Sequence, residues 1–81
     1  MENQFTTYDI LLTAFLLTSK KVSLIHIREA FPHKFVFVLT NSILCEQLSK
    51  DYLNYAVAPA RELFSNREML ISEIKRKEVM V

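Results

Sequence analysis

A run of five apolar residues at positions 35–39 (FVFVL) constrains the fold of this chain more than any other segment. Aromatic and β-branched residues favour a strand, which we predict over residues 34–40, and their side chains point alternately to its two faces. A strand that is apolar on both faces is normally central in a sheet or covered on both sides. The sequence indicates only one other strand, so we expect the missing cover to come from a third strand of another molecule or from a facing sheet in a dimer.

The other strand is predicted over residues 22–31, which are rich in β-branched side chains. Strict alternation divides its residues between two faces. One face carries Val22, Leu24, His26 and Arg28, and the other carries Ser23, Ile25, Ile27 and Glu29. Pro32 and His33 end this strand, so the two strands are most simply paired as an antiparallel hairpin.

A helix is predicted to precede the hairpin. Thr6 suits the N-cap, and Asp9 then occupies the third helical position, from which its carboxylate can bond back to the cap. Phe5 and Ile10 would form the accompanying hydrophobic staple. Apolar residues extend around much of this helix, which is predicted to end near residues 18–21, so it needs cover on two sides.

Two more helices are predicted after the hairpin. Asn41 and Ser42 are capping residues for a helix that runs to about Asn54, and Pro59 suits the first turn of a helix that runs to about Lys77. The buried stripe of the last helix is predicted to comprise Ala60, Leu63, Phe64, Leu70, Ile71 and Ile74. The predicted fold class is therefore α+β: a helix, an antiparallel β-hairpin and two helices, in the order α-β-β-α-α.

The length of the chain allows one hydrophobic core. Its 81 residues are predicted to form a single small domain, 1–81, with frayed ends at residues 1–4 and 79–81. A domain of this size is normally only marginally stable unless a cross-link such as a disulfide or a metal site stabilises it. Cys45 is the only cysteine, so no intrachain disulfide can form. We therefore expect oligomerisation or a partner to supply additional stability.

The apolar segments do not resemble those of a membrane or secreted protein. The longest apolar run, residues 10–17, has about half of the ~20 residues that a membrane span needs. Glu2 and Asp9 precede this run and Lys20 and Lys21 follow it, which is unlike a signal peptide. Together with the unpaired cysteine, these features predict no membrane association and a cytoplasmic location. The formal net charge of +1 gives no global attraction to nucleic acid.

The absence of glycine excludes several kinds of catalytic site. Phosphate-binding loops, dinucleotide-binding fingerprints and nucleophile elbows all need glycine. His26, His33 and Cys45 are too widely spaced to resemble a zinc motif. A thiol enzyme built on Cys45 and a histidine is a further hypothesis, because a helix N-terminus can lower a thiol pKa, but a cysteine in an amphipathic helix is usually a small buried hydrophobe. We expect no enzymatic activity, no catalytic residue, no bound metal and no cofactor.

Basic residues cluster between positions 20 and 34. Four cations stand against one acid, Glu29, which gives this segment a local charge of +3. A basic hairpin can lie along a phosphate backbone, although a solvated basic hairpin also protects a sheet edge. The candidate nucleic-acid-binding residues are Lys20, Lys21, His26, Arg28 and Lys34.

The first predicted helix resembles a known opening motif. Thr7-Tyr8-Asp9, followed by Ala14-Phe15-Leu16, is similar to the start of a family of short, uncharacterised prokaryotic and phage proteins, a domain of unknown function. Residues 35–37 match a Phe-rich strand of that family, and Phe64 with residues 67–70 matches its final helix. The resemblance implies the same order of elements and a bacterial, phage or mobile-element setting, and it carries no catalytic residues.

Surplus apolar surface on several elements predicts the function. The candidate interface residues are Ile10, Ala14, Leu17, Phe35 and Phe37. We predict a small non-catalytic protein-interaction module that self-associates, most simply as a dimer, or serves as a subunit of a larger bacterial or phage complex. The alternative is a nucleic-acid-binding accessory protein that uses the basic hairpin from Lys20 to Lys34.

Overall fold

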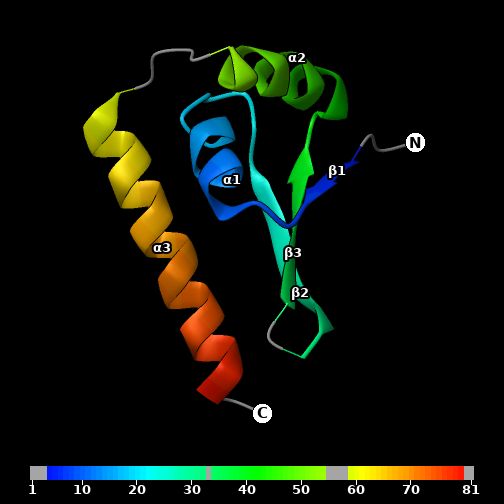
Figure 1. Cartoon of the computed structure of the whole chain (residues 1–81), viewed down its shortest axis with the longest axis vertical. Coiled ribbons are helices and arrows are strands. Elements are labelled where there is room, and N and C mark those ends of the chain that lie inside the picture. Colours follow the sequence, from blue (N-terminus) through cyan, green and yellow to red (C-terminus); the bar gives the residue numbers. More distant parts are fainter. Residues whose placement is uncertain (1–3, 33, 55–58, 80–81) are drawn as a thin grey trace.

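The computed structural model describes residues 4–32, 34–54 and 59–79. These residues form three helices and a three-stranded antiparallel sheet (Figure 1), which confirms the predicted α+β class. The elements in chain order are β1 (Gln4–Thr7), α1 (Ile10–Leu16), β2 (Leu24–Phe31), β3 (Lys34–Thr40), α2 (Ser42–Leu53) and α3 (Ala60–Val79). The observed order is therefore β-α-β-β-α-α, with one strand more than predicted.

The additional strand, β1, gives the apolar strand β3 its second neighbour. The strands lie in the order β1-β3-β2, so β3 is central. Phe5 lies opposite Leu39, and Thr7 lies opposite Phe37. The third strand thus comes from the same chain, and the expectation that another molecule supplies it is wrong. Gln4, expected in a frayed end, belongs to this strand.

The residues assigned to a helix start instead divide between β1 and α1. The N-cap of α1 is Asp9, whose Oδ1 accepts hydrogen bonds from the backbone N–H groups of Leu11 at 3.0 Å and Leu12 at 3.1 Å. Thr6 is therefore not the cap, and Phe5 does not form a staple with Ile10. Threonine and phenylalanine favour strands, and in β1 their backbone groups pair with β3, which they could not do at the start of a helix.

A split β-α-β unit results from this arrangement. Both β1 and β2 are antiparallel to β3, so they run parallel to each other, and α1 connects them across the sheet. The register of β2 shifts between Leu24 and His26, which leaves Ile25 in a β-bulge. Because of this bulge, Leu24 and Ile27 lie on the helix side, whereas His26 and Arg28 lie on the other side. The strict alternation predicted for this strand is wrong at Ile25.

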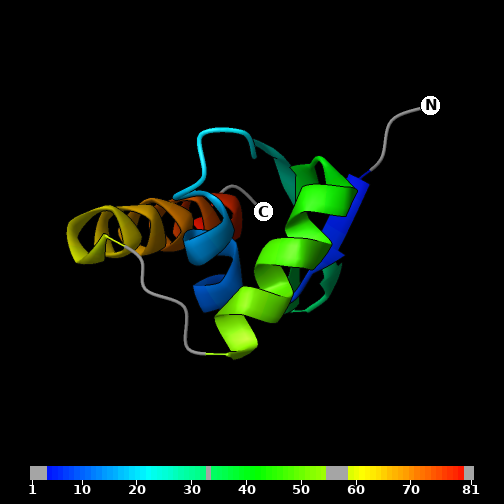
Figure 2. The same ribbon diagram turned by 90° about the horizontal axis from the view of Figure 1, so that it is seen from above.

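α1 and α3 lie on one face of the sheet, and α2 crosses the end of the sheet and passes over α1 on that same side (Figure 2). Two adjoining clusters of buried side chains form the core there. The first joins α1 and α3 to the sheet and contains Ala14, Ile27, Phe35, Phe37 and Leu70. The second joins α1 and α2 to the sheet and contains Phe15, Leu16, Val22, Leu39 and Cys45. Rings of Phe15 and Tyr52 meet in the second cluster with centroids 5.3 Å apart.

The two last helices have the predicted bounds to within a few residues. Asn41 caps α2 in a left-handed conformation, with φ of 60°, and its side chain accepts from the Leu44 N–H. In α3, Leu63, Leu70 and Ile74 pack inward as predicted, and the Asn66 amide donates to the Ala14 carbonyl at 3.1 Å. Phe64, predicted in the buried stripe, is 62% exposed because its side chain lies on the flank of the helix.

Candidate functional site

An open apolar cleft lies where α1 begins, between β3 and the second half of α3. Its volume is about 340 Å³, within the roughly 300–1,000 Å³ range of ligand-binding sites. The cleft is lined by Tyr8, Ile10, Lys34, Phe35, Phe37 and Ile74. Five of these six side chains are apolar or aromatic, so the cleft favours an apolar occupant.

The unequal lengths of two helices explain the cleft. The seven residues of α1 rise about 10 Å, whereas the twenty residues of α3 rise about 30 Å. α3 therefore packs on α1 and then continues past it towards the hairpin end of the sheet (Figure 1). Because α1 begins only at Ile10, no helix of the described segments fills the space between Ile74 and the first residues of β3.

One edge of the central strand is free beside this cleft. β1 ends at Thr7, opposite Phe37, so the preceding residues of β3 have no strand partner on that side within the described chain. The Thr40 N–H donates to the Ser23 carbonyl at 2.9 Å on the β2 side. Because backbone groups of a strand alternate in direction, Phe35 directs its N–H and C=O to the β1 side, past the end of β1. An extended segment could pair there with Phe35 and place a side chain in the cleft.

The structure brings three of the predicted interface residues together and separates two. Ile10, Phe35 and Phe37 line the cleft. Ala14 is fully buried between the helices and the sheet of its own chain, so it offers no surface to another molecule, which corrects its place among the interface residues. Leu17, at the other end of α1, is half-buried and packs against both core clusters. The sequence did not predict Tyr8 and Ile74 as cleft residues, because periodicity alone assigns them only to helix faces.

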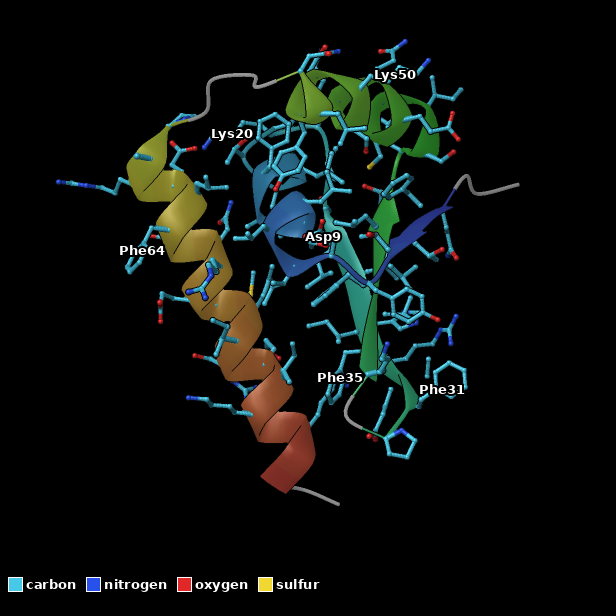
Figure 3. The ribbon with its side chains drawn as sticks, in the orientation of Figure 1. Asp9, Lys20, Phe31, Phe35, Lys50 and Phe64 are labelled. Atoms are coloured by element: carbon cyan, nitrogen blue, oxygen red, sulfur yellow. The ribbon has the colours of Figure 1, made fainter. Side chains whose placement is uncertain are left out.

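The five predicted nucleic-acid-binding residues do not form one patch. Lys20 and Lys21 follow α1 and precede β2, whereas Lys34 lies at the far end of the hairpin. The eight residues of β2 alone span about 23 Å between these positions. Figure 3 shows Lys20 beside the upper half of the molecule, away from Phe31 and Phe35. His33 lies outside the described residues.

Three of those five residues do share the sheet face that the helices leave uncovered. His26 lies opposite Val38, Arg28 opposite Val36, and Lys34 opposite Phe31. β1 adds Thr6 on the same face, opposite Val38. Lys34 is the first residue of β3 and also lines the cleft, so it belongs to both, whereas Arg28 belongs to the face alone.

Cys45 is placed as a core residue. Its side chain is fully buried, and its thiol donates to the Thr40 carbonyl at 3.3 Å. Burial raises the pKa of the Cys45 thiol, which opposes the lowering expected near the start of a helix. Within the described segments, no three His, Cys, Asp or Glu side chains gather where they could hold a metal ion.

Comparisons with known proteins add no relative. No family model, curated protein or solved structure matches this chain. The resemblance to short prokaryotic and phage proteins therefore stays a prediction. None of the helices in the described parts has the length and apolar character needed to cross a membrane.

Proposed function

We propose that this protein is a non-catalytic protein-interaction module that binds an extended segment of a partner protein along β3. The observation that carries the proposal is the free edge at Phe35 beside an apolar cleft. Strand addition of this kind combines main-chain hydrogen bonds with pockets for alternate side chains of the added strand. The partner's segment would continue the line of β1, which pairs with only the last four residues of β3.

The dimensions of the cleft suit one large apolar side chain. A closed apolar cavity of roughly 150 Å³ can hold benzene, and this open cleft has more than twice that volume. Burying a Phe or Leu side chain contributes about 1.5–3 kcal/mol, which corresponds to roughly 10- to 150-fold in affinity. The segment is therefore expected to carry Phe, Leu or a similar residue at its centre.

The charge around the cleft favours an acidic segment. Lys34 lies in the cleft wall and is the one charged residue among the described residues of its lining. Glu73, next to Ile74 in α3, is paired with Arg76 at 3.1 Å, and Glu29, opposite Phe35, lies on the β2 side of β3, away from the free edge. We therefore propose that the occupant is an apolar residue flanked by Asp or Glu in an extended segment of another protein. We also propose that this protein works in a cytoplasmic bacterial or phage complex.

Short peptides test this assignment directly. A peptide with a central Phe between acidic residues should bind in titration calorimetry, and replacing its acids by lysines should weaken binding. N-methylation of the peptide nitrogen that faces Phe35 should abolish binding, whereas N-methylation of the next nitrogen should not, because only alternate groups pair with β3. Insensitivity to both N-methylations would exclude strand addition.

Matched variants locate the site on the protein. Ile74→Trp should fill the cleft and weaken peptide binding at least about tenfold. Met69→Trp, on the opposite flank of the same helix, should leave binding unchanged. Lys34→Glu should weaken binding, whereas Lys50→Glu on α2 should not. Sedimentation of the protein alone decides whether a second copy is the occupant: an oligomer that Ile74→Trp dissociates would replace the proposed partner by self-association.

A further inference from the structure

The helix-free face of the sheet carries a second arrangement of side chains, which shares only Lys34 with the peptide-binding cleft. Its outward side chains form three successive rows across the strands. The rows are Thr6, Val38 and His26, then Val36 and Arg28, then Lys34 and Phe31. Consecutive rows are about 6.6 Å apart, because each is two residues further along β3.

The chemistry of these rows is cationic and aromatic. Arg28 and Lys34 are exposed cations, and no Asp or Glu occupies any position of the three rows. Arg28 has no ion-pair partner among the described residues. Phe31 is 61% exposed at the end of the hairpin, where Figure 3 shows its ring directed away from the helices. His26 is also exposed on this face.

Apolar side chains of β3 alternate with the polar ones across this face. Val36 and Val38 are 3% and 2% exposed although no helix of the described chain covers this face. Their cross-strand neighbours are Arg28 and His26, whose side chains start within about 5.5 Å of them. Arg28 and His26 therefore lie beside apolar residues on this face, and the guanidinium and the imidazole are both planar groups on which bases stack.

We propose that this face binds single-stranded nucleic acid. Arg28 and Lys34 contact successive phosphates, and Phe31 with His26 stacks on bases. The proposal does not rest on the peptide-binding cleft, because the two sites share only Lys34, and Arg28, His26 and Phe31 do not line the cleft. A duplex cannot lay its stacked bases on Phe31, so the face favours single strands over duplexes. Of the predicted residues, Lys20 and Lys21 take no part.

Fluorescence anisotropy with labelled oligo-dT, oligo-U and a duplex of equal length tests the proposal. Two phosphate contacts on a single strand predict a slope of about −1.4 in a plot of log affinity against log salt, or roughly a sevenfold loss between about 50 and about 200 mM salt. Binding of the duplex as tightly as the single strands would overturn the stacking assignment.

Three variants separate the contributions. Arg28→Gln should reduce the salt slope by about 0.7, because one phosphate contact is lost. Phe31→Ala should weaken binding about fivefold or more at every salt concentration without changing the slope. Lys50→Gln, which removes an exposed cation on α2, should leave both affinity and slope unchanged. The proposal fails if neither single strand binds at the lower salt concentration, or if Lys50→Gln and Arg28→Gln have equal effects.

Discussion

Truncation of Leu70 tests whether α3 belongs to the same cooperative unit as the sheet. Leu70 is fully buried and packs with Ala14, Ile27 and the phenylalanines of β3. Leu→Ala substitutions at buried sites cost about 3–5 kcal/mol, the sum of lost burial and the cavity left behind. The adjoining cleft lets neighbouring side chains move into the vacated space, so we expect a loss near the low end, about 3 kcal/mol.

That loss is large for a domain of this size. Native stability of about 0.05–0.15 kcal/mol per residue gives roughly 4–12 kcal/mol for the whole chain. Leu70→Ala should therefore remove a quarter or more of the free energy of unfolding. The neighbouring Met69, which is 40% exposed, provides a control on the same helix, and Met69→Ala should cost less than about 1 kcal/mol.

Urea unfolding followed by far-ultraviolet circular dichroism measures both quantities. The transition of Leu70→Ala should move to lower urea with an unchanged slope, because the surface exposed on unfolding is nearly the same. A loss below about 1 kcal/mol, or one equal to that of Met69→Ala, would refute the packing assigned to Leu70. A reduced slope with a residual helical signal would show that α3 separates from the sheet before the sheet unfolds.

Three further substitutions report on local structure. Asp9→Ala removes the acceptor for two N–H groups of α1 and should lower stability by about 0.5–2 kcal/mol in urea unfolding, with Asp9→Asn retaining most of it. Asn41→Ala loses the cap of α2 and places a Cβ-restricted residue at φ of 60°, so it should cost about 1–3 kcal/mol in thermal unfolding, and clearly more than Asn41→Gly. Burial raises the pKa of the Cys45 thiol in the folded state, so the unfolded thiol ionises first and stability should fall as the pH rises from the ordinary thiol pKa through the raised one. Cys45→Ala should remove that part of the alkaline decline, and an unchanged decline would contradict it.

Local sequence signals predicted most elements but not β1. The hairpin, α2 and α3 each have strong capping, breaking or periodic signals within their own residues. In the segment 5–10, threonine and aspartate suit both a helix cap and a strand end, so local preferences do not decide. What decides is β3, whose Phe37 lies opposite Thr7 thirty residues away in the chain. An apolar central strand needs two neighbours, and among the described residues β1 is the second.

The candidate sites were harder to predict for two physical reasons. The bulge at Ile25 places Leu24 and His26 on opposite faces of the sheet, although strict alternation predicts that they share one face. No residue type in this strand indicates the bulge. Lys20 and Lys34 are near each other in the sequence, but the extended strand β2 lies between them and places them at opposite ends of the molecule. The cleft depends on how far α3 extends past α1, which is a matter of packing rather than of local pattern.

The position of β3 between two parallel strands has a consequence for folding. β1 and β2 are synthesised first, yet they are bonded only to β3 and not to each other. Before β3 arrives the sheet therefore has no inter-strand hydrogen bonds, and the pairing of Gln4 with Thr40 must close a long loop. The sheet cannot assemble strand by strand as the chain emerges: it forms when its last strand enters the middle.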